Sequence, residues 1–280
     1  MQIRLATRRS RLARTQTEWV AARLRRSHPG LETVLVEVAT EGDRDRATPL
    51  ADLGGTGVFT KALQDAVTAG RADLAVHSFK DLPTTQAAGL TVAAVPARAD
   101  HRDVLVTAGG AGLAALAPGA VVGTSSPRRA QQLARARGDL VTAPIRGNVE
   151  TRIAKVLDGA FDATILAAAG LERLGIADLA SEVLDFLPAP GQGALALECR
   201  GDDSRTGALV ADLDDADTRD TVAAERAWLA ATGAGCATSA AALATLVGDT
   251  LELRWSLDGR EGSGRGHRRD AARVGREAAP

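Results

Sequence analysis

The sequence predicts an α/β protein with two similar α/β lobes and a small α+β domain. Short apolar strands alternate with amphipathic helices along most of the 280 residues, which is typical of α/β folds. Near the C-terminus one long helix precedes two strands, which predicts a separate α+β unit. A chain of this length can form two or three domains with buried cores.

Composition excludes several classes of protein. The chain is 45% hydrophobic and 25% charged, and its net charge is -1, whereas nucleic-acid-binding proteins are usually clearly basic. No apolar run approaches the roughly 20 residues that span a bilayer, and the N-terminus has no apolar signal-peptide core. We therefore expect a cytoplasmic protein with neither nucleic-acid nor membrane partners. Cys199 and Cys236 are too few for a disulfide framework and too far apart for a metal pair, so no metal is expected.

The first elements build one lobe. Residues 3–6 alternate as a strand, residues 7–10 lead into a helix that ends near Arg26, and residues 31–39 alternate again. The polar, glycine-rich segment 41–59 predicts a loop whose backbone is either mobile or closely approached by a ligand, and it lacks the Gly-Lys-Ser/Thr ending of a P-loop. A helix over 60–69 and strands over 73–76 and 90–95 follow.

Ionisable residues follow the strand over 73–76. His77, Ser78, Lys80 and Asp81 come directly after it, and ligands of open α/β sheets bind where strands end. Taken alone, Lys80 and Asp81 fit an ordinary solvated surface pair. We expect His77 to be structural rather than catalytic.

A second lobe begins near residues 95–98, with strands over 104–106, 121–122 and 163–167. In the segment 123–129, Ser126 is a good N-cap and Pro127 suits the first helical position. The hydroxyls of Thr124 and Ser125, with the free N–H groups of that helix, predict an anion site. Arg128 and Arg129 oppose the helix dipole, which makes sense if they face a bound anion rather than solvent.

Two more arginines accompany the next helix. Asn148 can cap it, which places Arg146 just before the helix and Arg152 one turn inside. Arginine pairs with carboxylate or phosphate, so arginines on converging loops predict a polyanionic ligand. Asp81 would remain ionised among them and could stabilise a cationic intermediate or move a proton. A short helix over 170–175 follows the strand.

The C-terminal part begins after a Pro/Gly-rich hinge at 187–193 and a strand over 194–200. A helix over 217–231 leads to the loop 233–239, where Cys236 is exposed enough for covalent attachment. A lone cysteine is otherwise usually a small buried apolar residue, as we expect for Cys199. Strands over 240–247 and 251–257 follow, and we predict that the polar tail from Arg260 onward is only partly ordered.

Together these segments resemble the porphobilinogen deaminase family, also called hydroxymethylbilane synthases, over nearly the whole chain. The matching stretches are ATRRSRLARTQ (6–16), GGTGVFTKAL (54–63), RADLAVHSFKDLP (71–83), VGTSSPRRAQQL (122–133), PIRGNVETR (144–152), ILAAAGLERLG (165–175) and PGQGALALECR (190–200), with the cysteine loop. Thr56 departs from the lysine that many relatives have.

The resemblance implies a fold of three domains, of which the first two are similar to type II periplasmic binding proteins. It implies limits at 1–97 with 194–215, 98–193, and 216–280, because the strand after the hinge returns to the first domain. It also implies a monomeric transferase that joins four porphobilinogen molecules head to tail, releases ammonia each time, and hydrolyses the product to hydroxymethylbilane.

The same resemblance assigns roles to residues. A dipyrromethane cofactor would be bound to Cys236 through a thioether, and Asp81 would be catalytic. The other cofactor-binding positions would be Lys80, Thr124, Ser125, Ser126, Arg128, Arg129 and Arg146, and the substrate-binding positions Arg8, Ser10, Arg146, Arg152 and Arg173.

Two other functions use the same features. A non-catalytic two-lobed protein that binds a small polycarboxylate would suit the lobes and arginines, but it has no use for Asp81 or an exposed Cys236. An enzyme with a phosphate ligand is weakened because the sequence has neither a P-loop nor a dinucleotide fingerprint.

Overall fold

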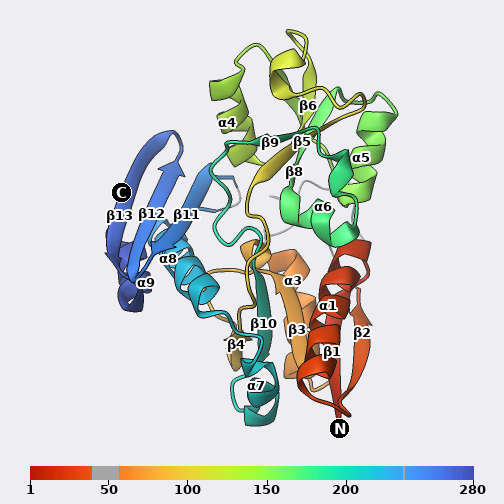
Figure 1. The fold of residues 1–280 in the computed structure, drawn as a ribbon, viewed down its shortest axis with the longest axis vertical. Coiled ribbons are helices and arrows are strands. Elements are labelled where there is room, and N and C mark those ends of the chain that lie inside the picture. Colours follow the sequence, from red (N-terminus) through yellow and green to blue (C-terminus); the bar gives the residue numbers. More distant parts are fainter. Residues whose placement is uncertain (40–56, 236) are drawn as a thin grey trace.

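The computed structural model describes residues 1–39, 57–235 and 237–280, which form two α/β lobes and a third domain (Figure 1). The predicted fold class is therefore confirmed. Most of the predicted loop 41–59, with Thr56, lies outside the described residues, and so does Cys236. The last three residues of that predicted loop instead begin helix α3 (Gly57–Thr68).

The first lobe contains a mixed sheet with the order β2-β1-β3-β10-β4 in the described part of the chain. These strands span Glu32–Val38, Gln2–Arg8, Leu74–Ser78, Leu195–Arg200 and Leu90–Ala94. β1 is parallel to β2 and β3, whereas β10 is antiparallel to β3 and β4. Alternation along β1 divides the core: Ile3 and Leu5 pack with α1 (Arg11–Ser27) and α7 (Ser204–Ala211), and Ala6 packs with α3.

The second lobe repeats this plan with the order β7-β6-β8-β5-β9. These strands span Val141–Ala143, Val121–Gly123, Ala163–Ala167, Asp103–Thr107 and Glu182–Leu184. β6 is parallel to β7 and β8, and β5 is antiparallel to β8 and β9. Helix α4 (Pro127–Ala136) packs in one core cluster, and α5 (Val149–Leu157) and α6 (Ala168–Leu174) pack in another. The prediction of two similar lobes is confirmed.

A buried ion pair ties the two segments that cross between the lobes, residues 95–102 and 185–194, to the third domain. The guanidinium of Arg98 contacts both carboxylate oxygens of Glu225, at 2.6 and 3.0 Å. Glu225 lies on helix α8 (Ala216–Thr232), and its side chain is fully buried. It also accepts hydrogen bonds from the backbone N–H groups of Gly191 (2.7 Å) and Ala244 (2.9 Å). One carboxylate therefore joins four chain segments.

We expect Glu225→Ala to lower the free energy of unfolding by about 3–5 kcal/mol, because it leaves a buried guanidinium and two N–H groups without their acceptor. Denaturant unfolding measures this loss. Glu252→Ala is the control, since Glu252 pairs with Arg265 at the surface, with side chains 46% and 72% exposed, and should cost at most about 1 kcal/mol. Equal losses would contradict the account of Glu225.

The third domain packs α8 and α9 (Ala271–Glu277) on an antiparallel sheet with the order β11-β12-β13. These strands span Ala240–Val247, Thr250–Leu257 and Arg260–His267. Trp228 of α8 stacks on Trp255 of β12, with ring centroids 5.8 Å apart. The prediction that the tail from Arg260 onward is only partly ordered is wrong, because β13 pairs with all of β12 and α9 follows it.

Three glycines of β13 explain the error. Glycine normally weakens a strand, so this segment has a poor strand signal. Here Gly262, Gly264 and Gly266 lie at alternate positions, and a Cβ at each would come within 2.6 Å of Trp255, Ala278 or Val274 respectively. The glycines therefore permit close packing, which is a tertiary requirement and not a local preference. Within the described residues, no helix is long and apolar enough to cross a membrane.

Candidate active site

The turn after β3 carries the first two candidate residues. β3 is buried up to His77, and a 3₁₀ turn, η1 (Phe79–Asp81), follows at its C-terminal end. Lys80 and Asp81 thus stand where a sheet presents ligand-binding loops. The Nε2 of His77 lies 3.0 Å from Glu198 on the neighbouring strand, and both side chains are 2% exposed. This pairing agrees with the structural role expected for His77.

The hydroxyl groups before α4 organise two loops. Ser126 caps α4 by accepting from the N–H of Arg129 at 3.4 Å, and Pro127 occupies the first helical position, as predicted. Thr124 accepts from the N–H of Ser126 at 3.2 Å. The Ser125 hydroxyl donates to the carbonyl of Ile145 (2.9 Å) and accepts from its N–H (3.1 Å). These bonds hold the loop before α4 against the loop that carries Arg146.

Arg128 and Arg129 are buried, and both face a carboxylate that the sequence analysis missed. Asp103, the first residue of β5, lies 2.7 Å from Arg128 through Oδ2 and 2.7 Å from Arg129 through Oδ1. Burial favours the neutral acid, but Arg129 and Arg128 outweigh it and hold the pKa of Asp103 well below its usual range. An acidic residue at the start of the apolar run DVLV was the available signal.

Gln192 joins this cluster to Lys80. The side-chain amide of Gln192 is buried; it accepts from Lys80 Nζ at 3.1 Å and donates to Asp103 Oδ1 at 2.9 Å. The next residue, Gly193, has φ +87°, and a Cβ there would lie 2.5 Å from the carbonyl oxygen of Ala99. The PGQG hinge therefore lies directly against the other crossing segment and links the first lobe to the second.

Lys80 is a weaker base than an ordinary lysine. Burial and, to a smaller extent, the nearby Arg129 lower the pKa of Lys80 to about 8, against the attraction of Asp81 and Asp103. Because this folded-state pKa lies below the ordinary value of 10.5, the charged amine destabilises the fold below pH 8. That penalty disappears as the pH rises from 8 toward 10.5, and the site loses a positive charge over the same range.

We expect one lysine signal of the cofactor-free protein, labelled with ¹³C at Cε, to titrate near pH 8 and to vanish in Lys80→Arg. The sequence has only three lysines, so assignment by substitution is direct. A polycarboxylate ligand should raise this pKa, because a nearby carboxylate favours the ammonium form. A signal of Lys80 that titrates above pH 10 without ligand would contradict the description of its environment.

Asp81 lies among further arginines. Burial, with repulsion from Arg129 and Arg146, lowers the pKa of Arg152 to about 10, and attraction to Asp81 opposes that shift. In the described part of the chain, the Asp81 carboxylate has no hydrogen bond or ion pair, and the buried Nη1 of Arg146 has no hydrogen-bond partner. Both groups are therefore available to a ligand.

The remaining candidates lie nearby in the fold. Arg8 ends β1, whose parallel pairing with β3 brings its C-terminal end to the same edge of the sheet as Asp81. Ser10 caps α1 by accepting from the N–H of Ala13 at 3.3 Å. Arg173 donates to the carbonyl of Gly193 at 2.7 Å, and burial lowers its pKa to about 10.

The electrostatic balance of the cluster is positive. Among the described residues, five cations surround two carboxylates; these residues are Lys80, Arg128, Arg129, Arg146, Arg152, Asp81 and Asp103. The positive charges outnumber the carboxylates, and the buried Nη1 of Arg146 lacks a hydrogen-bond partner, so the arrangement suits a ligand with several carboxylates. The residues predicted to bind a polyanion therefore lie together in one cluster, in which the Asp103 carboxylate already pairs with Arg128 and Arg129.

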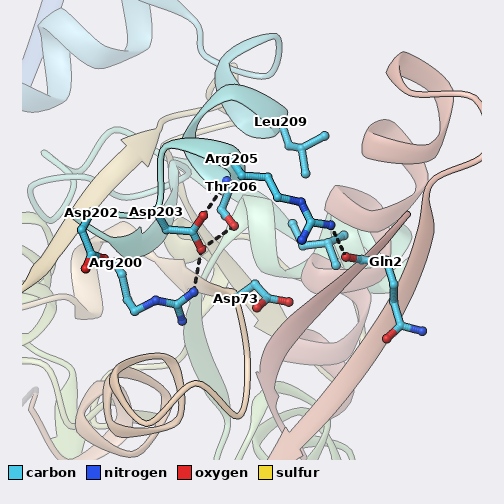
Figure 2. A pocket seen from close by; sticks show the side chains of 9 residues that line it. Gln2, Asp73, Arg200, Asp202, Asp203, Arg205, Thr206 and Leu209 are labelled. Atoms are coloured by element: carbon cyan, nitrogen blue, oxygen red, sulfur yellow. Dashed lines mark hydrogen bonds and ion pairs between the residues drawn. The ribbon is translucent and has the colours of Figure 1, made fainter.

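A separate cavity of about 330 Å³ lies at the opposite edge of the first sheet, next to the starts of β1 and β3 (Figure 2). Several polar groups that line this cavity form hydrogen bonds or ion pairs with one another. Asp203 pairs with Arg200 at 2.6 Å and accepts from Thr206, and Arg205 donates to the carbonyl of Gln2. These satisfied groups support the lobe and do not form the candidate site.

Comparisons with known proteins identify a family of similar sequences. The family model "Porphobilinogen deaminase, dipyromethane cofactor binding domain" matches residues 3–208. Porphobilinogen deaminase from Acidothermus cellulolyticus is 50% identical over 258 residues, covering 90% of this chain and 77% of that protein. The Sorangium cellulosum enzyme is 49% identical, covering 94% and 88%. Among solved structures, the methionine-binding protein MetQ aligns with a TM-score of 0.48 at 12% identity, covering 76% of this chain and 89% of that one.

Proposed function

The chain belongs to the porphobilinogen deaminase family, and we propose that the cluster around Asp81 performs its hydroxymethylbilane synthase reaction. Family members are transferases that join four porphobilinogen molecules head to tail, release ammonia at each step and hydrolyse the product to hydroxymethylbilane. The observation that supports this site best is the unpaired Asp81 carboxylate inside a cluster of cations. A site of pure anion binding would gain nothing from such a carboxylate.

The described residues fit the dipyrromethane cofactor of the family. Its acetate and propionate groups need several cationic donors, and the Nη1 of Arg146 is a buried donor without a hydrogen-bond partner in the described chain. We assign Lys80, Arg128, Arg129 and Arg146 to these carboxylates. We assign Thr124, Ser125 and Ser126 mainly to the shape of the loop, because their hydroxyls already bond to the backbone. When bound, the cofactor supplies the pyrrole on which chain growth starts.

Asp81 is the proposed catalytic residue. Loss of ammonia from porphobilinogen leaves positive charge on the pyrrole, and a carboxylate fixed beside that pyrrole stabilises the charge as it develops. Arg8, Ser10, Arg146, Arg152 and Arg173 would bind the substrate carboxylates. The surplus of cations therefore holds the substrate, while the single unpaired anion acts on the reacting group.

The test is incubation of the purified protein with porphobilinogen. We expect stoichiometric ammonia release, four molecules for each hydroxymethylbilane formed. The competing function, non-catalytic binding of a polycarboxylate, predicts that porphobilinogen binds, as seen by calorimetry, but that no ammonia appears. That result would overturn the proposed reaction.

Four further properties belong to the proposal. We propose domain limits at 1–97 with 194–215, 98–193, and 216–280, which the insertion of β10 between β3 and β4 supports. We also propose a monomeric, cytoplasmic protein with no membrane partner. Size-exclusion chromatography with light scattering checks the monomeric state. Fractionation of cells checks the cytoplasmic location and the absence of a membrane partner.

A further inference from the structure

Helix α8 contacts the turn that carries Lys80 and Asp81 through one side chain, Arg226. Its Nη1 donates to the carbonyl oxygens of Phe79 (3.3 Å) and Leu82 (2.8 Å), and its Nη2 donates to the carbonyl of Pro83 (2.6 Å). These carbonyls bracket Lys80 and Asp81 in the sequence. The guanidinium therefore holds the backbone of the turn on both sides of the proposed catalytic residue.

Apolar contacts reinforce this attachment. The guanidinium carbon of Arg226 lies 4.4 Å from the centroid of the Phe79 ring, a cation–π distance. One helical turn earlier, Val222 is buried in a core cluster with Phe79 and Leu82. The ring of Phe79 is thus fixed on one side by Val222 and faced by the cation of Arg226.

Only arginine can make this set of contacts. Three carbonyls at the end of a 3₁₀ turn present partial negative charge in different directions, and a planar guanidinium has donors to match them. Burial lowers the pKa of Arg226 to about 10, so the group stays charged at neutral pH. A lysine would place one ammonium there and could satisfy fewer of these acceptors.

We propose that Arg226 is a positioning residue, which fixes the Lys80–Asp81 turn relative to the helix that leads to Cys236. From Arg226, α8 continues to Thr232 and is capped by Gly233, three residues before Cys236. The helix whose Arg226 holds the proposed catalytic turn therefore ends, in the sequence, shortly before the proposed attachment point of the cofactor. This inference rests on the proposed function, but the claim that Arg226 fixes the turn can be tested without measuring turnover.

The test compares Arg226→Leu and Arg226→Lys with Arg219→Leu. Arg219 lies two turns earlier on α8 and also anchors it to the first lobe, by a hydrogen bond to the carbonyl of Ala93 (3.1 Å) and an ion pair with Asp214 (2.6 Å). No hydrogen bond or ion pair joins Arg219 to the catalytic turn in the described chain, so its loss removes an anchor between α8 and the first lobe without releasing the turn.

We expect Arg226→Leu to lower kcat by about 10–100-fold with KM changed less than about threefold, because small displacements of a catalytic group slow the reaction strongly. Arg226→Lys should recover part of the loss. Amide exchange at Leu82, whose N–H bonds to the Phe79 carbonyl at 3.1 Å, should accelerate about tenfold in cofactor-free Arg226→Leu. Arg219→Leu should change neither kcat nor this exchange rate.

Unchanged exchange at Leu82 in both Arg226 variants would overturn the inference, and so would equal effects of Arg219→Leu. If the wild-type protein releases no ammonia from porphobilinogen, the proposed function fails, while the exchange rates still decide whether Arg226 fixes the turn.

Discussion

Asp81→Ala should abolish turnover of porphobilinogen while leaving the fold intact. A positioned proton-transfer group or charge contributes about 10²–10⁴-fold to a rate, and Asp81 is the single unpaired carboxylate of the cluster in the described chain. Its removal breaks no hydrogen bond there and loses only its attraction to Lys80 and Arg152, so the free energy of unfolding should change by no more than about 1 kcal/mol. Steady-state ammonia release and denaturant unfolding measure the two quantities.

A matched control separates a local effect from a general loss of negative charge. Asp65 on α3 is exposed and pairs with Lys61 at the surface, so Asp65→Ala should keep normal turnover. Asp81→Asn preserves the shape of the side chain and should be as inactive as Asp81→Ala if charge is what matters. Near-normal activity of either Asp81 variant would refute the role assigned to this residue.

Cys236→Ser should prevent stable attachment of the cofactor and thereby remove activity. A thioether forms from a thiolate, and a serine hydroxyl is a far weaker nucleophile at neutral pH. The mass of the denatured variant should equal that of the unmodified chain. The residues of the cationic cluster remain in this variant, so it should still bind porphobilinogen reversibly, as measured by calorimetry.

Cys199→Ala is the control for this substitution. Cys199 is 1% exposed and packs in the core of the first lobe, as predicted from its place in an apolar strand. Burial raises the pKa of the Cys199 thiol, which makes it a poor nucleophile. The control should therefore retain the cofactor. A covalently loaded Cys236→Ser protein would contradict the assignment of the attachment point.

Local signals predicted much of the fold. The caps Ser126 and Asn148 start α4 and α5 as expected, because an N-cap and a following proline are read within four residues. The patterns of apolar residues predicted the strands of both lobes. Helix α7 had no prediction although Asp203 caps it, and β13 was misread because its glycines serve packing against Val274 and Trp255.

The site residues that follow the ends of strands could be predicted from the sequence. The residues that join the site through long-range contacts could not. Lys80, Asp81 and Arg146 follow strand ends, so their placement was readable. Asp103 and Gln192 were not, because their partners lie 26 and 112 residues away and meet only when the two crossing segments come together. The partial neutralisation of Arg129 by a buried acid is a property of the tertiary structure.

The intact mass of the denatured, purified protein, followed by peptide mapping, tests the central claim most directly. The account predicts added mass equal to two linked pyrrole units on the peptide that contains Cys236, and ammonia release when porphobilinogen is added. An unmodified chain that binds porphobilinogen without releasing ammonia would contradict it, and the polycarboxylate-binding function would take its place.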